Sequence, residues 1–215
     1  MISKEELKEY IKEADNGDDI SQHVVAEYYH YGGGAVEDYE VIKENVNYKK
    51  AFKYYLLGAQ NNSVLFFSTL AQFYYNGIGI KKNYKEALKW FKKASEPYKY
   101  EDFDVARMLY LGQGCKKDIF TALKTLKNID KAIRSRSSSY ENIYGYSYYN
   151  PVHCLFIGDL YFYGKAGFKK DWKKAHSIWQ AARQTESSHI KARLAKNYIY
   201  GRGVDVDLEE GAAYL

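Results

Sequence analysis

A short pattern recurs five times in this chain of 215 residues and constrains its fold more than any other feature. Each copy runs from an apolar segment through a glycine-rich turn to an Asn or Asp, and then to a segment that holds a small residue. The first glycines of the turns, separated by 45, 35, 52 and 37 residues, are Gly32, Gly77, Gly112, Gly164 and Gly201. Units near 35 residues that hold two helices are typical of helix-turn-helix solenoids.

The segment before each turn has the spacing of a helix that packs closely on others. A long or branched apolar residue is followed by a small one, which lets two helices approach. These pairs are Val25-Ala26, Leu70-Ala71, Val105-Ala106, Ile157-Gly158 and Leu194-Ala195. One helical turn later, on the same face, a large residue stands three positions before the glycine. These residues are Tyr29, Tyr74, Leu109, Tyr161 and Tyr198.

The turn and the segment after it predict a second helix. The first glycine can adopt the left-handed conformation that ends a helix, and the second glycine permits a sharp turn. The predicted N-caps of the second helices are Asn47, Asn83, Asp118, Asp171 and Asp207. Small residues follow four positions later at Ala51, Ala87, Ala122, Ala175 and Gly211. The large residues expected to fill the core are Tyr54, Tyr55, Trp90, Phe91, Leu126 and Trp179.

From about Val24 to Leu215 the pattern resembles the Sel-one-like repeat (SLR) family, relatives of the tetratricopeptide repeats. Thr125 in place of an aromatic residue, Gly211 in place of Ala, and one extra residue in the turn of residues 165–167 depart from that pattern. The resemblance implies an all-α, right-handed α/α superhelix, or solenoid, of about five repeats in one domain. The expected repeats span residues 19–62, 63–97, 98–134, 150–186 and 187–215.

The ends and two longer segments add to this plan. Ser3 and Glu6 form a capping-box pattern, which predicts an N-terminal capping helix within residues 1–18. An enlarged turn is expected over residues 35–46, and residues 135–149 form a Tyr- and Ser-rich insertion suited to adaptable contacts. Asn150-Pro151 is expected to restart a helix. The chain stops inside the second helix of the last unit, so either that repeat is truncated or more protein once followed, and self-association through its exposed face is expected.

Composition excludes several classes of function. The 32 Lys and Arg against 27 Asp and Glu give a net charge of +5, too mild and too dispersed to favour nucleic acid. The first ten residues mix charges and favour neither a leader nor a membrane anchor. Cys115 and Cys154 cannot build a disulfide framework, so we expect a cytoplasmic protein. The 24 tyrosines reflect either genomic base composition or selection for binding.

No catalytic or metal-binding motif stands out. The five histidines fall in different units without helical metal-site spacing, and adjacent residues such as His153 and Cys154 point in different directions on a helix. The triple glycine at residues 32–34 lacks the Lys and Ser or Thr of a phosphate-binding loop. We therefore expect no enzyme activity, cofactor or metal.

The resemblance implies that the first helix of each repeat lines a concave groove, by analogy with tetratricopeptide proteins. Residues two, five and six positions after the branched core residue lie on a face distinct from the core. They are Glu27, His30 and Tyr31; Gln72, Tyr75 and Asn76; Arg107, Tyr110 and Leu111; Asp159, Phe162 and Tyr163; Lys196, Ile199 and Tyr200. The insertion adds Tyr140, Tyr144, Tyr146 and Tyr148. Two interpretations stay open: the rings anchor a partner, or they pack between neighbouring repeats.

The predicted function is a protein-interaction module, an adaptor or scaffold, that holds a peptide or protein in the groove, without nucleic acid or membrane. The charges on the central positions alternate in sign, which suits a phosphate backbone poorly. One alternative is an immunity-type inhibitor of a toxin or another enzyme. Another is a hydrolase, since some family members are reported to bind or hydrolyse β-lactams, but those relatives look cysteine-rich and secreted.

Overall fold

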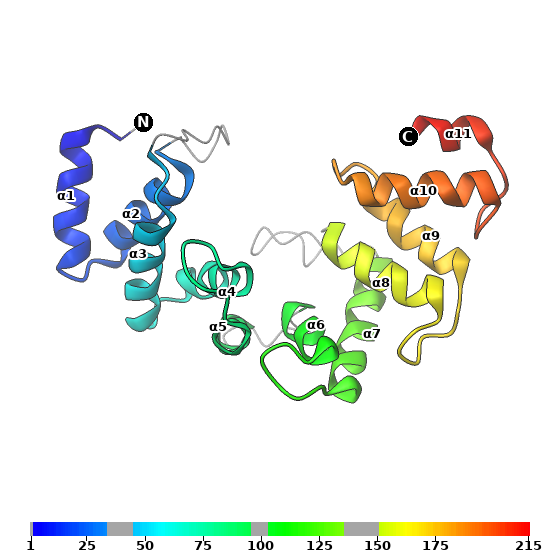
Figure 1. Ribbon diagram of the computed structural model, residues 1–215, viewed down its shortest axis with the longest axis horizontal. Helices are drawn as coiled ribbons and strands as arrows, with labels where there is room; N and C mark the ends of the chain where they lie inside the picture. The colour runs from blue at the N-terminus through cyan, green and yellow to red at the C-terminus, as the bar shows by residue number, and fades with distance from the viewer. Residues whose placement is uncertain (1, 34–44, 96–102, 136–150) are drawn as a thin grey trace. The chain divides into compact units, whose positions relative to one another are not determined.

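A computed structural model describes residues 2–33, 45–95, 103–135 and 151–215, the side chains of residues 130–135 excepted. Its contacts divide the chain into two compact units, Met1–Lys117 and Asp118–Leu215, and each is described by itself. Every regular element among the described residues is helical (Figure 1). The expectation of a single solenoid domain concerns how the units combine, and it stays a prediction. The enlarged turn and the Tyr- and Ser-rich insertion fall almost wholly outside the described residues.

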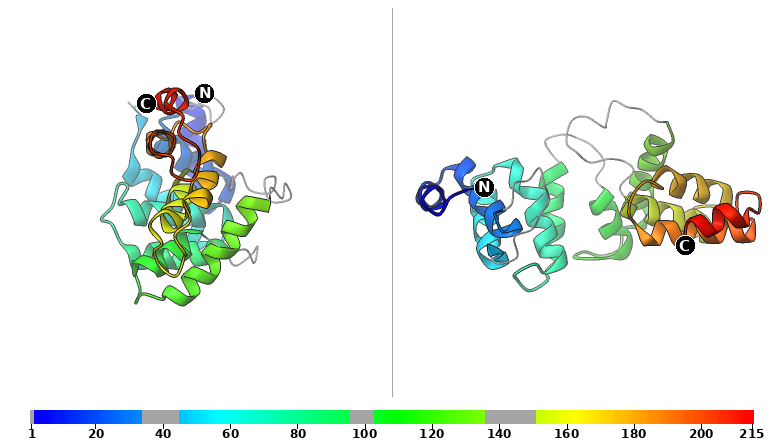
Figure 2. Two further views of the ribbon diagram at one scale, coloured as in Figure 1. Left: turned by 90° about the vertical axis from the view of Figure 1, so that its right-hand side faces the viewer. Right: turned by 90° about the horizontal axis from the view of Figure 1, so that it is seen from above.

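The first unit consists of helix pairs that follow one another along the chain. Its elements are α1 (Lys4–Asp15), α2 (Asp19–Tyr31), α3 (Tyr48–Gln60), the 3-10 helix η2 (Val64–Phe66), α4 (Phe67–Asn76), α5 (Tyr84–Ser95) and α6 (Phe103–Leu111). The most extensive contacts join α2 to α3 and α4 to α5, which are the two helices of the first and second repeats. Helix α1 packs on α2, α3 on α4, and α5 on α6, so each repeat covers the next (Figure 2).

The second unit repeats this arrangement. Its helices are α7 (Ile119–Ser135), α8 (Pro151–Tyr163), α9 (Trp172–Ala181), α10 (Ser188–Tyr200) and α11 (Leu208–Ala213). Helix α8 pairs with α9 and α10 pairs with α11, while α10 also contacts α8 and α9. Helix α8 begins at Pro151, where the sequence predicted a restart.

The predicted caps of the second helices are confirmed in all five repeats. Each cap side chain accepts a hydrogen bond from the backbone N–H three residues later, as Asp171 does from Lys174 at 2.9 Å. These bonds satisfy amide hydrogens that have no partner within a helix. At the other side of the turn, Gly32, Gly77 and Gly201 end their helices with φ of 78°, 76° and 62°, the predicted left-handed conformation.

The second glycine of the turn has a role beyond turning the chain. A Cβ on Gly79 would lie 2.6 Å from the carbonyl carbon of Tyr48, the first residue of the preceding repeat's second helix. Gly114 meets the backbone of Tyr84 in the same way, and Gly203 meets that of Trp172. Each of these glycines also has a positive φ. The position therefore requires glycine both for its backbone conformation and for the contact between repeats.

The core confirms most of the predicted inward positions. The small residues after the caps are buried, and so are the large residues one turn later, with Tyr55 2% and Trp179 1% exposed. Before the turn of the second and third repeats, however, the deepest position lies one residue earlier than expected. Phe73 and Met108 are completely buried, whereas Tyr74 is half-buried. Residues three and four positions after Leu70 both flank it on the helix, and the first of them meets the neighbouring helices more closely.

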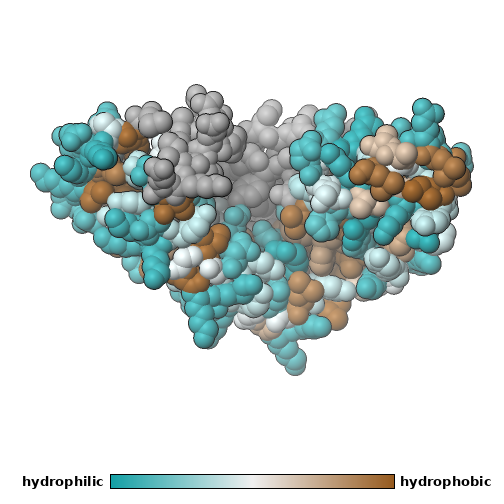
Figure 3. Space-filling view, turned by 45° about the horizontal axis from the view of Figure 1, so that its top comes forward, coloured by the Kyte–Doolittle hydropathy of each residue, from teal (hydrophilic) through white to brown (hydrophobic). Residues whose placement is uncertain are grey.

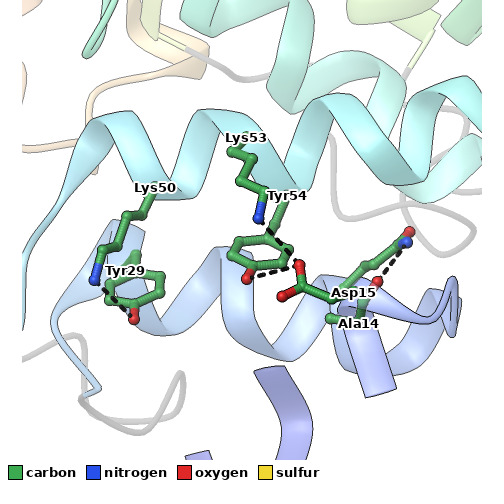
Figure 4. Close-up of polar contacts among 7 residues, drawn as sticks. Ala14, Asp15, Tyr29, Lys50, Lys53 and Tyr54 are labelled. Carbon is green, nitrogen blue, oxygen red and sulfur yellow. Dashed lines mark hydrogen bonds and ion pairs between the residues drawn. The ribbon is translucent and has the colours of Figure 1, made fainter. Parts of the chain in front are cut away.

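The predicted capping helix α1 is held to the first repeat by polar contacts (Figure 4). Ser3 and Glu6 form the expected capping box. At the other end of the helix, Asp15 Oδ1 accepts hydrogen bonds from Lys53 Nζ at 3.0 Å and from Tyr54 Oη at 3.2 Å. The buried Gln22 Nε2 donates to the Ala14 carbonyl at 3.0 Å. These bonds fix the end of α1 against both helices of the first repeat.

Candidate partner-binding surface

Three of the five central residues predicted to line the groove are held by neighbours on their own chain. The pairs are Glu27 with His23 at 3.5 Å, Arg107 with Asp104 at 2.9 Å, and Asp159 with Arg193 at 2.7 Å. Gln72 and Lys196 are exposed. These pairs give the three side chains contacts within the chain, and their part in binding a partner stays a prediction.

The Asp159–Arg193 pair is the shortest of these three contacts. Arg193 Nε donates to one oxygen of Asp159 and Nη2 to the other, both at 2.7 Å. Such a two-pronged pair gives geometric specificity as well as energy. It joins α8 of the fourth repeat to α10 of the fifth, and thereby fixes the spacing of the two first helices.

Among the residues five positions after the branched core residue, Tyr75 and His30 pack against the next repeat. Tyr75 lies 5.2 Å from the Tyr84 ring and 4.7 Å from the Arg107 guanidinium, and its hydroxyl donates to Gln113 at 3.0 Å. His30 contacts Phe73 of the next repeat at 4.9 Å between ring centroids. For these two residues the packing interpretation describes the structure. Phe162, Tyr110 and Ile199 are likewise half-buried.

The residues six positions after the branched core residue are exposed. Each is the last residue of the first helix of its repeat, where the chain leaves the helix for the glycine turn. They are Tyr31 (39% exposed), Asn76, Leu111 (40%), Tyr163 (55%) and Tyr200 (62%). The aromatic series is therefore divided: His30 and Tyr75 pack against the next repeat, whereas Tyr31, Tyr163 and Tyr200 are exposed.

A second outward-facing series begins the second helices, and it was not among the predicted site residues. Its members are Tyr48 (44% exposed), the half-buried Tyr84, Ile119 (47%), Trp172 (38%) and Leu208 (65%). The signal was present in the sequence, because a large apolar residue directly follows each N-cap. These side chains start at the same turn at which the first helices end.

Arg202 connects the two series in the second unit. It stands between the two glycines of the last turn, and its guanidinium carbon lies 5.1 Å from the Tyr200 ring, 5.8 Å from Phe162 and 5.9 Å from Trp172. Cations over aromatic faces are attracted by the ring quadrupole. We name Phe162, Tyr163, Trp172, Tyr200 and Arg202 the second-unit aromatic surface.

These repeats have known counterparts. The profile of the Sel1 repeat family matches residues 20–63, 70–96, 103–124, 154–184 and 191–215. The chain belongs to the Sel1 repeat family. The predicted SLR resemblance is thereby confirmed, and the family profile finds the same five repeats as the glycine turns.

Individual Sel1 repeat proteins share the fold at low identity. The crystal structure of a Sel1 repeat protein from Oxalobacter formigenes aligns with a TM-score of 0.65 and 23% identity, over 97% of this chain and 54% of that one. The structure of c5321, a protective antigen of uropathogenic Escherichia coli with an SLR fold, aligns with a TM-score of 0.51 and 19% identity, over 97% of this chain and 47% of that one. These likenesses confirm the predicted all-α solenoid fold class.

An uncharacterised Sel1-like repeat-containing protein of Schizosaccharomyces pombe is 25% identical over 201 residues. The alignment covers 77% of this chain and 30% of that protein. The chain thus spans less than a third of this curated relative and about half of the two solved structures.

The described parts of these Sel1 repeats contain no group of three or more His, Cys, Asp or Glu residues arranged to hold a metal ion. No helix within the described ranges is long and apolar enough to cross a membrane. Burial raises the pKa of Cys154 to about 12, which disfavours a thiolate nucleophile there. The four tyrosines of the insertion, Tyr140, Tyr144, Tyr146 and Tyr148, lie outside the described residues.

Proposed function

We propose that this Sel1 repeat protein is a non-enzymatic adaptor or scaffold that binds a peptide or protein through the exposed ends of its first helices. The exposure of Tyr163 and Tyr200 carries the proposal, because each ring is more than half exposed although it lies on a helix that packs in the core, where Tyr161 and Trp179 are buried. Aromatic residues and Arg dominate the binding energy of protein interfaces. Sel1 repeats are in general protein-interaction modules. The predicted groove itself stays a prediction, and each unit carries its own part of the surface.

The one thiol buried in the second unit does not suggest a nucleophile, because burial raises the pKa of Cys154 to about 12. A cytoplasmic location suits a protein whose two cysteines, Cys115 and Cys154, are both free thiols.

Affinity purification from native extract with mass spectrometry tests the proposal. The parent is compared with a Tyr163→Ala/Tyr200→Ala variant, and Phe120→Ala is the control because it removes a ring that is 83% exposed elsewhere in the same unit. We expect a protein that parent and control recover and the double variant loses, at an unchanged melting temperature. Recovery of the same proteins by all three would refute this surface.

Self-association through the last repeat is a separate part of the proposal. Val206 and Leu208 are 63% and 65% exposed, and hydrophobic residues gather over the C-terminal helices of the second unit (Figure 3). Sedimentation of the parent and of Leu208→Lys at increasing concentration tests this self-association. We expect the parent to associate and Leu208→Lys to stay monomeric. A parent that stays monomeric would remove this idea.

A further inference from the structure

Three cations of the second unit lie over its outward-facing rings. Lys165 Nζ is 4.9 Å from the centre of the Tyr163 ring, Lys170 Nζ is 4.6 Å from that of Trp172, and the Arg202 guanidinium carbon is 5.1 Å from that of Tyr200. Tyr163 and Tyr200 are more than half exposed, and Trp172 is 38% exposed. A molecule that touches these rings therefore also meets the cations.

None of these three cations has a carboxylate within ion-pair distance among the described residues. Their neighbours differ: Arg193 is paired with Asp159 at 2.7 Å, and Lys174 with Asp171 at 3.8 Å. Arg193 and Lys174 also lie over rings, those of the buried Trp179 and Tyr161, so the cations over the exposed rings differ from them in having no carboxylate partner among the described residues.

The chain around these rings is strongly basic. Residues 165–174 contain five lysines and one aspartate, and all five lysines are exposed. Like charges held on one surface attract an oppositely charged partner and speed its encounter. Charge complementarity therefore favours a partner that carries carboxylates.

We infer that the second-unit aromatic surface, with Lys165 and Lys170, binds an acidic segment of a partner protein. Apolar or aromatic side chains of that segment cover the rings of Tyr163, Trp172 and Tyr200. Its Asp and Glu carboxylates pair with the cations that lie over those rings. The inference rests on the proposed function and specifies the chemistry of the partner.

The distribution of charge favours an acidic peptide over a single-stranded nucleic acid. Arg202 is followed in the sequence by four exposed acidic residues, Asp205, Asp207, Glu209 and Glu210, which limits the run of positive charge in this part of the chain. A phosphate backbone needs a longer positive track, whereas a short peptide with a few carboxylates does not.

Selection from a random twelve-residue peptide display library, on the immobilised full chain, tests the inference without a known partner. The parent is compared with Lys170→Gln/Arg202→Gln. The control, Lys124→Gln/Arg183→Gln, removes one exposed Lys and one exposed Arg elsewhere in the second unit. Circular dichroism melting establishes that the variants are folded.

We expect the parent and the control to select peptides rich in Asp and Glu beside an aromatic or large apolar residue. Those peptides should bind Lys170→Gln/Arg202→Gln about tenfold or more weakly than the parent, which is equivalent to about 1.4 kcal/mol. Added salt should weaken their binding to the parent. A selection without acidic enrichment, no selected peptides, or equal binding to both double variants would overturn the inference. Tighter binding of a ten-residue oligothymidine than of any selected peptide would assign the surface to nucleic acid instead.

Failure of this inference is distinguishable from failure of the proposed function. If the proteins recovered from extract are lost by Tyr163→Ala/Tyr200→Ala but retained by Lys170→Gln/Arg202→Gln, the surface binds proteins and the acidic specificity is wrong. If both variants retain them, the surface itself is wrong.

Discussion

Gly203 lies directly against the backbone of Trp172, the first residue of α9, and adopts a φ of +82°. No side chain fits between the last turn of the chain and the start of the preceding repeat's second helix. Gly167, in the lengthened turn of the fourth repeat, has a similar φ of +74°, but its nearest neighbour is Leu123 Cδ1 at 3.6 Å from an added Cβ. A comparison of Gly203 with Gly167 therefore separates the effect of backbone conformation from the effect of close packing.

Gly203→Ala should destabilise the protein more than Gly167→Ala. Both variants carry the left-handed strain of about 1–2 kcal/mol, and only the first also forces two backbones apart, which adds about 1–3 kcal/mol. Urea unfolding followed by circular dichroism measures the difference. Equal free energies of unfolding for the two variants would show that the close contact between Gly203 and Trp172 adds no cost to the substitution.

Asp15→Ala should loosen α1 with little effect on the remaining repeats. The change removes the acceptor shared by Lys53 and Tyr54, and because Asp15 is half-exposed we expect a loss of about 1 kcal/mol or less. Hydrogen exchange measures the opening of α1. Glu9→Ala, an exposed change in the same helix, is the control, and equal exchange in the two variants would contradict a docking role for Asp15.

Acidification should destabilise the protein through two histidines. Burial lowers the pKa of His30 and of His176 below the ordinary value of 6.5. As the pH falls below about 6.5, the unfolded chain therefore takes up protons before the folded one, and the free energy of unfolding decreases until the pH passes the folded pKa. Above pH 6.5 this contribution to stability is fully present.

Urea unfolding between pH 7.5 and 5 checks this expectation. His30→Gln and His176→Gln should each flatten the decline, whereas His189→Gln, at an exposed position, serves as the control. A decline of the same slope in all three variants would assign the acid sensitivity to carboxylates.

The two thiols should differ in reactivity. Cys115 is half-buried in a glycine turn, whereas Cys154 is buried in α8 and its pKa is raised to about 12. Iodoacetamide at pH 8 should therefore modify Cys115 in the folded protein and Cys154 only on unfolding. Mass spectrometry of peptides, with and without urea, gives both rates. Modification of Cys154 at the same rate in both conditions would mean that α8 is not packed as described.

Local chemistry made the turns predictable. An Asn or Asp followed by a small residue four positions later specifies a capped helix, and glycine before it specifies a left-handed end, so Asp171 and Gly201 were assigned correctly from their neighbours alone. The site was harder to predict. Tyr75 and Tyr163 belong to the same repeating pattern, yet the first packs against Arg107 and the second is 55% exposed.

The sequence by itself determined the number of repeats, the position of each turn, the helix caps and the small residues at which helices meet, because these depend on backbone conformation and on spacing within one repeat. Only the tertiary structure decided which aromatic residues face solvent and which cations lie over them. That outcome depends on how one repeat covers the next: Arg202 reaches Trp172 across 30 residues because Gly203 lets the two backbones touch. Exposure is a property of the neighbours, and the sequence pattern of a single repeat does not contain it.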